Sequence, residues 1–399
     1  MAKVILHIDL NAFFVRCEEL QDPSLKDKPV IIGHSGRGGV VSTCSYAARK
    51  YGVHSGMPTF KALQLCPNAI IIHGHYDLYS RKSHEFINFV KRFSTIIEQA
   101  SIDECYVDMT QKLKGNKDPI GFIKQMQDDL LKETGLMCSI GVAPTKFLAK
   151  MGSDYKKPMG ITVIHRKDIP QILYPLPIES FFGIGKKTAP KLRQLGINTI
   201  GDLAERINNE DIATKQEFGK FYYGIKEWIT GYGSDEVETE PWDPKSIGNS
   251  TTFKENTNNI DEIKEYVRSL SKEVSDRAKE SNKVGYSVQL VLKDKDFKVI
   301  NRSKKLTKPT NDFMIIFSTA VDLLEANLGD KIIRLAGVTL QNLMDPTEVV
   351  IQMSIFDNYE EIKEECAVKL LIGELNRKMK KPVFKTAADS LRDKKYGIK

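Results

Sequence analysis

The sequence predicts an α+β fold of several domains, the first of which has a ferredoxin-like order of strands and helices. The chain has 399 residues, which is enough for two to four domains with separate hydrophobic cores. Residues 3–10 alternate in polarity, as a half-buried strand does. After them come an insertion, a helix, two strands, a helix and a strand that ends at residue 142. This is the order of a ferredoxin-like unit with one long loop.

The elements of this first unit can be placed in order. A stretch rich in Gly and small polar residues, 11–76, precedes a helix that we predict over residues 77–98, where apolar residues recur at helical spacing. Short strands lie on either side of Asp103 and Glu104, and a second helix leads to a strand at 137–142. We expect the two helices to cover one face of the sheet and to leave the other face open.

The rest of the chain divides by composition. Residues 167–232 predict short-looped helices, and residues 233–249 indicate a linker because Gly, Glu and Pro are frequent there. Over residues 250–341 the order strand, helix, strand, strand, helix, strand appears again. We expect the topology of the first unit here, without a sequence repeat. The remaining residues are polar apart from one apolar cluster at 352–356.

Composition is that of an ordinary soluble globular protein. The formal net charge of +7 is a mild excess, which allows nucleic acid as a partner without requiring it. The six cysteines form no CxxC pair and no zinc-ligand pattern, which favours reduced thiols over disulfides. No apolar run approaches the ~20 residues of a membrane span, and the first residues do not resemble a secretion signal. We therefore expect a soluble cytoplasmic protein.

Three acidic residues form a candidate metal site. A tight turn would bring the neighbouring Asp103 and Glu104 to one point, although such a pair is more often a solvated hairpin turn. Asp9 ends the first strand on the side opposite its main apolar row, where it could equally cap the next segment. If the three carboxylates meet, their repulsion is best offset by divalent cations, and carboxylate oxygen suits magnesium.

Four co-linear motifs carry a resemblance to a known family. They are HIDLNAFF at 7–14, STCSYAARKYG at 42–52, SIDE at 101–104 and SIGVAPTKFLAK at 139–150. Over about residues 1–345 the chain resembles the Y-family translesion DNA polymerases, and the bacterial DNA polymerase IV and UV-protection members most closely. The resemblance implies a multidomain right hand with a palm at 1–10 and 77–166, fingers at 11–76, a helical thumb at 167–232, a linker at 233–249, a little finger at 250–343 and a tail at 344–399.

The resemblance also implies the chemistry. Asp9, Asp103 and Glu104 match the family's catalytic, metal-binding carboxylates, with the Leu10 carbonyl as a further ligand of two Mg2+ ions. Such a pair of ions lowers the pKa of the primer 3′-hydroxyl, holds the triphosphate and stabilises the leaving pyrophosphate. The implied enzyme is a DNA-directed DNA polymerase, a nucleotidyltransferase of low fidelity without proofreading.

The family's nucleotide contacts match Phe14, Thr43, Tyr46, Arg49 and Lys157. Tyr46 and Arg49 are three residues apart, so one helical turn would place both on one face. Arg and Lys suit phosphate, although the alternative for each is a solvated surface charge. Phe14 takes the steric-gate position, where an aromatic ring lies under the sugar and excludes a 2′-hydroxyl. Its neighbour Phe13 should face the core.

Residues 182–187, with the Leu and Gly residues after them, resemble a helix-hairpin-helix. There Gly183 and Gly185 would let backbone amides, beside Lys186, approach a DNA phosphate. Pro190 fits only if it lies in the first turn of a helix.

A second DNA-binding candidate is the segment from Lys293 to Lys308, which has seven basic and two acidic residues, a net charge of +5. Such a run is usually a solvated edge. The resemblance places it on the domain that grips DNA and favours phosphate contacts by Lys298, Arg302, Lys304 and Lys305.

The apolar cluster in the tail resembles the peptide by which bacterial polymerases hold the sliding clamp. Its residues are Gln352, Met353, Ser354, Ile355 and Phe356. We therefore expect three partners, primer–template DNA, dNTP and the sliding clamp, for a monomer that does not contact membranes.

Two other interpretations remain open at this point. One is a non-catalytic, clamp-tethered DNA-binding protein, which the three intact acids argue against. The other is a palm-bearing nucleotide cyclase, which shares the metal chemistry but explains neither the hairpin motif, nor the basic segment, nor the clamp-like peptide.

Overall fold

The computed structural model describes residues 3–240 and 242–349, together with isolated positions between 368 and 387. The predicted clamp peptide at 352–356 lies outside the described residues. In the described part of the chain, no helix is both long enough and apolar enough to cross a membrane.

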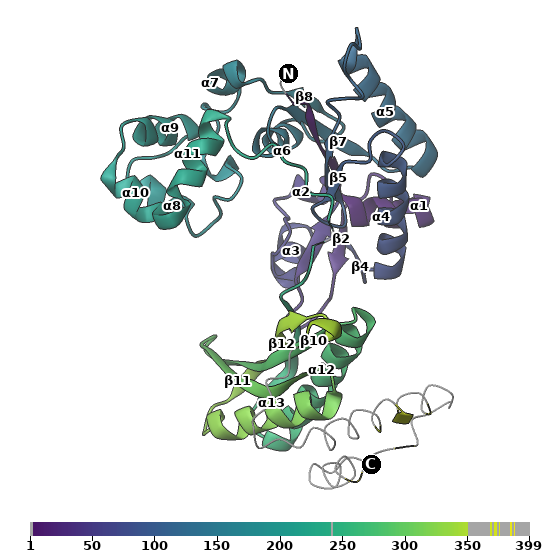
Figure 1. The fold of residues 1–399 in the computed structure, drawn as a ribbon, viewed down its shortest axis with the longest axis vertical. Helices are drawn as coiled ribbons and strands as arrows, with labels where there is room; N and C mark the ends of the chain where they lie inside the picture. Colours follow the sequence, from purple (N-terminus) through teal and green to yellow (C-terminus); the bar gives the residue numbers. More distant parts are fainter. Residues whose placement is uncertain are drawn as a thin grey trace. The chain divides into compact units, whose positions relative to one another are not determined.

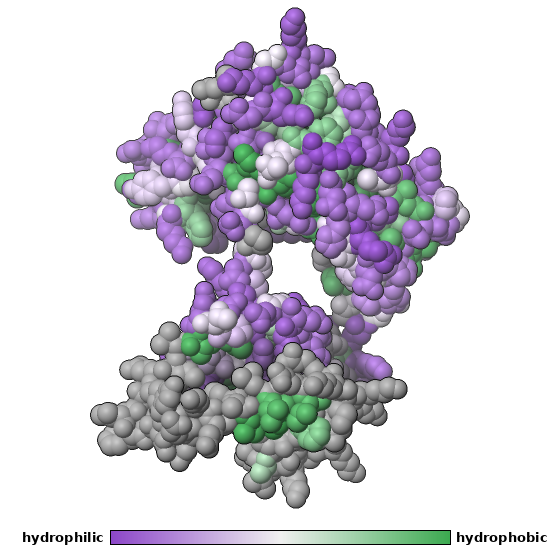
Figure 2. Space-filling view, turned by 45° about the vertical axis from the view of Figure 1, so that its right-hand side comes forward, coloured by the Kyte–Doolittle hydropathy of each residue, from purple (hydrophilic) through white to green (hydrophobic). Residues whose placement is uncertain are grey.

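The chain separates into two compact units, Met1–Pro241 and Trp242–Lys399. The division falls inside the segment 233–249 that we predicted as a linker. On the face drawn in Figure 2, hydrophilic side chains cover most of the first unit, and apolar ones appear in small separate groups.

The first unit is built around a five-stranded sheet with the order β5-β6-β1-β7-β8. Its strands are β1 (Ile5–Leu10), β5 (Ile97–Gln99), β6 (Glu104–Asp108), β7 (Cys138–Ala143) and β8 (Ile161–Val163). β1 is antiparallel to both neighbours, β6 and β7, and β8 is added parallel to β7. The first four strands have the ferredoxin-like order, as predicted, so the strand that carries Asp9 lies at the centre.

Three helices cover one face of this sheet and lie together on its side in Figure 1: α1 (Phe13–Gln21), α4 (Tyr76–Val90) and α5 (Pro119–Thr134). All three bury apolar residues in the same core as the central strands. The helix predicted over 77–98 ends earlier, at Val90. The later residues pair with β6 as the edge strand β5, because the sheet supplies backbone hydrogen bonds that override the helical spacing.

We predicted that the opposite face of the sheet would be open, and this was wrong: helix α6 (Lys146–Tyr155) packs across it. Ala149 of this helix comes so close to β7 that a Cβ on Gly141 would lie 1.9 Å from the Ala149 carbonyl oxygen. A glycine in the strand therefore lets the helix backbone approach. The strongly one-sided apolar face of α6 requires burial, and this sheet face provides it.

Five short helices follow: α7 (Ile169–Ile172), α8 (Ala189–Gln194), α9 (Ile200–Asn208), α10 (Ile212–Phe218) and α11 (Tyr222–Thr230). They confirm the predicted helical segment and share one hydrophobic core with α6. Within it the rings of buried Phe147 and partly buried Trp228 stack with centroids 5.3 Å apart. Pro190 lies in the first turn of α8, the place where proline is tolerated.

The insertion after β1 forms its own small sheet, with the order β3-β2-β4. Its elements are β2 (Val30–Gly33), β3 (Val41–Cys44), α2 (Tyr46–Arg49), α3 (Thr59–Leu65) and β4 (Ile70–Ile72). A separate small core, which includes Ile31, Ala48 and Ala62, stabilises it. Helix α1 belongs by its packing to the larger core instead, although it lies within the predicted insertion.

Within residues 242–349, the second unit has a four-stranded antiparallel sheet and two α-helices. Its elements are β9 (Ser246–Thr257), α12 (Ile260–Glu280), β10 (Val284–Asp294), β11 (Val299–Thr310), α13 (Phe313–Asn327) and β12 (Ile333–Met344). The predicted order of elements is confirmed. β9 begins at Ser246, earlier than the expected residue 250, because its first residues pair with the end of β12.

The expectation that both units share one topology was wrong. The second sheet has the order β11-β10-β12-β9, so its second and fourth strands are central, whereas the first and third are central in the first unit. Buried Val288 and Leu290 occur in β10, and Val338 and Leu340 occur in β12. The two strands with continuous buried rows take the centre, and the basic strand β11 takes an edge.

Candidate active site

The candidate site begins with the pairing of the two central strands of the first unit. Asp9 on β1 lies opposite Glu104 on β6 in the antiparallel register, so the two side chains share one face of the sheet. The backbone N–H of Leu10 donates to the carbonyl oxygen of Asp103 at 2.9 Å. This bond holds the acidic turn beside the end of β1, so the structure brings Asp9 to the acidic pair.

Three side chains in this place can hold a metal ion together. His7, Asp9 and Glu104 each offer one ligand atom, and these atoms lie within 4.8 Å of one another. Among the described residues, this group does not include Asp103, whose Oδ1 accepts a hydrogen bond from the Ser101 hydroxyl at 2.6 Å. Sequence analysis did not identify His7. Its position two residues before Asp9, on the same face of the strand, was the available signal.

Two lysines already contact these carboxylates, and sequence analysis identified only one of them. Lys150 Nζ lies 3.1 Å from Asp9 Oδ2 and 2.7 Å from Glu104 Oε2. Lys157 Nζ lies 2.7 Å from Asp9 Oδ1. Lys150 comes from helix α6, so the helix that closes this face of the sheet also delivers a positive charge to it.

The electrostatic environment separates the two neighbouring acids. The His7 ring and the Lys150 ammonium group beside Glu104 hold the pKa of its carboxyl at about 2. Burial raises the pKa of Asp103, and the nearby charges of Asp9 and Glu104 raise it further. Burial opposes the charge on Lys150, but Asp9, Asp154 and Glu104 outweigh this effect and raise the pKa of Lys150. Glu104 and Lys150 are therefore both ionised at neutral pH.

The residues present fit a divalent cation. Asp9 and Glu104 supply hard carboxylate oxygens, the ligands that Mg2+ prefers. His7 Nε2 is buried and makes only a long contact, 3.4 Å, with Glu104 Oε2. It therefore lies within reach of the same site as the two carboxylates.

A cavity of about 260 Å³ opens beside the carboxylates and collects the predicted nucleotide contacts. Asp9, Leu10, Phe14, Thr43, Tyr46, Arg49, Asp103 and Lys157 all line it. They come from β1, α1, β3, α2, the acidic turn and the segment after α6. Every predicted nucleotide contact therefore lies in one cavity, next to two of the three predicted catalytic acids.

Helix α2 orients two of these contacts. The Ser45 hydroxyl caps it by accepting from the Ala48 N–H at 3.2 Å, which is a favourable start for so short a helix. On its exposed side the Arg49 guanidinium lies over the Tyr46 ring, 4.8 Å from the centroid. The predicted sharing of one helical face by Tyr46 and Arg49 is confirmed.

Phe14 is supported by aromatic residues that sequence analysis did not identify. Its ring stacks on Tyr79 at 4.2 Å between centroids and 11° between planes. The Tyr79 hydroxyl donates a short hydrogen bond to buried Glu18, which His75 Nδ1 also contacts at 2.9 Å. Phe13 is buried in the core, as predicted. The ring of Phe14 thus has a fixed backing on the side away from the cavity.

Asn11 connects three segments around the cavity. Its side chain donates to the Ser139 hydroxyl at 3.0 Å, and its Oδ1 accepts from the Met159 N–H at 2.8 Å. Buried side-chain amides with both ends bonded fix local geometry. Asn11 therefore positions the segment that carries Lys157 against the end of β1.

The predicted DNA contacts of the second unit are divided between two faces of its sheet. Arg302 and Lys304 lie opposite Leu290 and Val288 in the register, on the face that α13 covers. Arg302 Nε donates to Asn327 at 2.9 Å, and Lys304 Nζ lies 3.1 Å from Asp322.

The other face carries the remaining cations. Lys305 lies opposite Ser287, and Lys293 lies opposite Val299. A shallow hollow of about 920 Å³ on this face is lined partly by small residues, including Gly248, Ser250 and Gly337. Lys298 lies in the turn between β10 and β11.

The turn before α8 has the backbone of the predicted hairpin. Gly183 adopts a φ of +95°, a conformation that favours glycine. A Cβ on Gly185 would meet nothing within 4 Å, so the backbone is open to approach at this point. Lys186 is exposed beside it.

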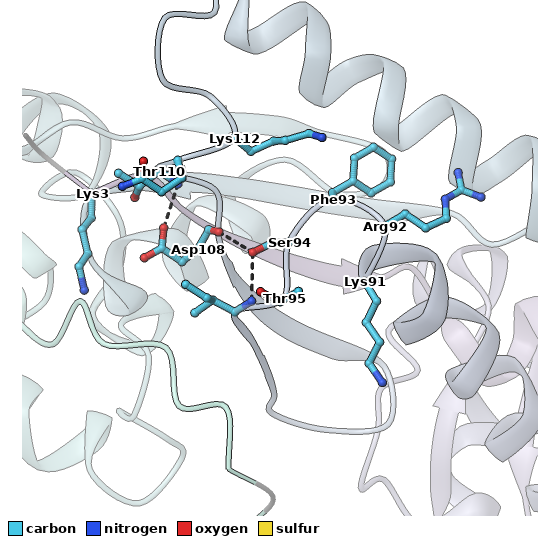
Figure 3. Close-up of a pocket in the computed structure, with 11 residues that line it drawn as sticks. Lys3, Lys91, Arg92, Phe93, Ser94, Thr95, Asp108, Thr110 and Lys112 are labelled. Carbon is cyan, nitrogen blue, oxygen red and sulfur yellow. Dashed lines mark hydrogen bonds between the residues drawn. The ribbon is translucent and has the colours of Figure 1, made fainter.

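A larger cavity of about 650 Å³ lies at the other end of β6, at Asp108 (Figure 3). Its basic lining residues are Lys3, Lys91, Arg92 and Lys112. Arg92 is bonded at two points to Glu133, at 2.6 and 2.9 Å. Among the described residues that line this cavity Asp108 is the only acid, and its carboxylate accepts from the Thr110 N–H at 2.8 Å. The cavity therefore does not form part of the candidate active site.

Comparison with known families agrees with this geometry. The impB/mucB/samB family matches residues 8–154, its C-terminal domain matches 244–355, and the IMS family HHH motif matches 166–197. The last range contains the predicted helix-hairpin-helix.

Relatives with similar sequences extend over almost the whole chain. It is 37% identical to a DNA polymerase IV of Bacillus anthracis over 395 residues, which are 98% of this chain and 94% of the relative. It is 38% identical to a DNA polymerase IV of Listeria monocytogenes over 344 residues, 86% of this chain and 96% of the relative.

Solved structures are similar as well. A Y-family DNA polymerase chimera of Dbh and Dpo4 has a TM-score of 0.75 and 29% identity. An insertion ternary complex of Dbh DNA polymerase has a TM-score of 0.57 and 28% identity. Each comparison covers 86% of this chain and 99% of the other.

Proposed function

This chain belongs to the impB/mucB/samB family of Y-family translesion DNA polymerases, and we propose that it extends a primer by metal-assisted phosphoryl transfer at Asp9, Asp103 and Glu104. It is a DNA-directed DNA polymerase. The cavity that contains all five predicted nucleotide contacts beside two of these acids is the observation that carries the proposal.

We propose Asp9, Asp103, Glu104 and the Leu10 carbonyl as ligands of two Mg2+ ions. Such ions, when bound, supply Lewis-acid stabilisation of charge on the attacking and leaving oxygens. Within the chain, the pairing of β1 with β6 orients Asp9 and Glu104. Asp103 is held from two sides, by the Leu10 N–H on its carbonyl and the Ser101 hydroxyl on its carboxylate.

For the nucleotide, we propose that Arg49, Lys157 and Tyr46 hold the triphosphate and that Thr43 adds a hydroxyl contact. Arg is suited to bidentate phosphate contact, and Lys acts as a point charge. Phe14 excludes the 2′-hydroxyl, because a ring backed by Tyr79 cannot yield to extra bulk. Each of these side chains lines the same cavity, except Tyr79, which supports it from behind.

Primer–template DNA and dNTP are the partners that this function requires, and one structural relative is an insertion ternary complex of a DNA polymerase. We propose DNA phosphate contacts at Gly183, Gly185, Lys186, Lys298, Arg302, Lys304 and Lys305, and we add Lys293. The open-face positions of Lys293 and Lys305 make them the strongest candidates.

We propose that residues Gln352 to Phe356 bind the bacterial sliding clamp. We also propose that the polymerase itself is a monomer. Alanine at Gln352 and Phe356 should abolish stimulation by the clamp and leave synthesis without the clamp unchanged. Equal stimulation of the variant and the parent protein would exclude this assignment.

Primer extension with dNTPs and Mg2+ tests the function directly. The protein should extend a primer on undamaged template and past an abasic site, with errors, and should not remove a mismatched 3′ end. Arg49→Ala should raise the KM for dNTP about tenfold or more through loss of a charge-assisted phosphate contact. DNA binding without any extension would favour the non-catalytic alternative.

A further inference from the structure

The two carboxylate oxygens of Asp9 each contact an ammonium group. Lys157 Nζ lies 2.7 Å from Oδ1, and Lys150 Nζ lies 3.1 Å from Oδ2. Lys150 also lies 2.7 Å from Glu104 Oε2. A divalent cation bound between these carboxylates needs its oxygens at about 2.0–2.6 Å. The cation and the Lys150 ammonium group would therefore occupy the same space, so one must leave when the other arrives.

The lysines cannot simply be left without partners. The side chain of Lys150 is only 11% exposed and that of Lys157 is 24% exposed. A buried ammonium group that loses its counter-charge carries a large desolvation penalty. Metal binding at Asp9 and Glu104 is therefore easier if another acceptor stands within reach of both lysines.

Asp154, in the last turn of α6, is such an acceptor. Its Oδ2 lies 3.5 Å from Lys150 Nζ, and its Oδ1 lies 2.8 Å from Lys157 Nζ. Among the described residues, Asp154 is the only carboxylate besides Asp9 itself that forms an ion pair with both lysines. The side chain of Asp154 is 46% exposed, so it can adjust without disturbing the core.

We propose that Asp154 is a positioning residue that receives the ammonium groups of Lys150 and Lys157 when a divalent cation takes their place on Asp9 and Glu104. This inference rests on the proposed role of Asp9 and Glu104 as metal ligands. Lys150 neutralises Asp9 and Glu104 before the cation arrives. Asp154 then lowers the free-energy cost of moving the Lys150 ammonium group away from these acids.

The alternative is that Asp154 is an ordinary helix-surface ion pair. The chain offers a matched control in Asp128 on α5, which pairs with Lys124 at the same i,i+4 spacing and has a 48% exposed side chain. Asp128 lies outside the metal-capable group. Asp128→Asn removes the same charge from the same kind of pair, away from the acids.

Binding of Mn2+ alone to the full-length protein, followed by electron paramagnetic resonance, tests the inference without activity. Asp154→Asn should weaken Mn2+ binding about three- to tenfold, whereas Asp128→Asn should not change it. Lys150→Gln should tighten binding, and in the Lys150→Gln background the effect of Asp154→Asn should fall to less than half. Thermal melting checks that each variant is folded.

The outcomes separate two failures. If Asp154→Asn has the same effect with and without Lys150, Asp154 acts only through its distant charge and the inference is overturned. An unchanged affinity in Asp154→Asn overturns it as well. If Asp9→Asn leaves Mn2+ binding unchanged, the proposed metal site itself is wrong, whatever Asp154 does.

Discussion

The two large sheets of this protein have the same order of strands and helices along the chain. They differ in where they carry charge: the first has acids on its central strands, and the second has basic residues on an edge strand. In the first unit the central pair, β1 and β6, carries Asp9 and Glu104, and helix α6 covers them. In the second unit the edge strand β11 carries most of the basic residues of the segment from Lys293 to Lys308, and these are exposed.

The difference follows from what each charge has to do. Carboxylates that share a cation must be held close together, which needs a central strand with a neighbour on each side. Cations that contact a backbone of phosphates need reach and solvent access, and lysine on an edge strand also prevents unwanted strand pairing. The buried acids are therefore expected to be sensitive to any change, and the exposed bases only to changes on one face.

The largest effect is expected at the acidic turn. Asp103→Asn should lower the rate of primer extension about 10³-fold or more, with little change in DNA affinity. Because burial and neighbouring acids raise the pKa of Asp103, ionisation of its carboxyl is less favourable in the folded than in the unfolded protein. The variant should therefore melt at an unchanged or higher temperature. Near-normal extension by this variant would show that catalysis does not require the Asp103 carboxylate.

The acid stability of the first unit should depend on Glu104. Its folded pKa of about 2 lies below the ordinary glutamate value of 4.5, so it contributes stability above pH 4.5 that is lost as the pH falls toward 2. The difference corresponds to at most about 3 kcal/mol. Glu104→Gln should flatten the pH dependence of urea unfolding between pH 5 and 2, followed by Trp228 fluorescence in a Trp242→Phe background. If this variant kept the wild-type pH dependence of unfolding, the stabilising contacts of Glu104 with His7 and Lys150 would be contradicted.

Sugar discrimination should respond less strongly than catalysis. Phe14→Ala should raise the ratio of ribonucleotide to deoxyribonucleotide incorporation about 10- to 100-fold, in the range of a single apolar pocket contact. Tyr79→Leu should raise it less, because it removes only the backing of the ring. Single-nucleotide insertion with matched dNTP and rNTP pairs measures both. Unchanged selectivity in Phe14→Ala would place the gate elsewhere.

The smallest effect compares two adjacent lysines on β11. Lys305→Gln, on the open face, should weaken binding of primer–template DNA several-fold and lower the salt slope by about 1. Lys304→Gln is the matched comparison: its ammonium group already pairs with Asp322 on the helix side, so its loss should weaken DNA binding less than the loss of Lys305. Equal losses from both variants would show that the face of the sheet does not matter.

Local patterns in the sequence were sufficient for much of the fold. The alternation in residues 3–10, the helix that begins at Pro119 and the element order of the second unit all appear in the structure. Each depends on period and end signals within one segment. The helix predicted as far as residue 98 failed because pairing of β5 with β6 involves residues outside the segment.

The residues of the candidate site also fall into two groups, those that local motifs could identify and those that only packing brings to the site. Motifs were sufficient to name Asp9, the acidic pair and the nucleotide contacts, since the order of elements brings these segments together. They could not identify His7, Lys150 or Asp154, because a histidine in a strand and a lysine and an aspartate on a helix have no distinctive local pattern. Their relation to the acids exists only after α6 packs on the sheet.

The sequence by itself determined most of the segments that become strands and helices, with β5 as an exception, and it determined which residue types are available for chemistry. The tertiary structure alone decided which strands became central, which face of β11 each cation occupies, and which lysines neutralise the buried acids. The physical reason is that hydrophobic period is a property of neighbours along the chain. Charge pairing and burial depend on neighbours in space, and tertiary packing determines which residues become such neighbours.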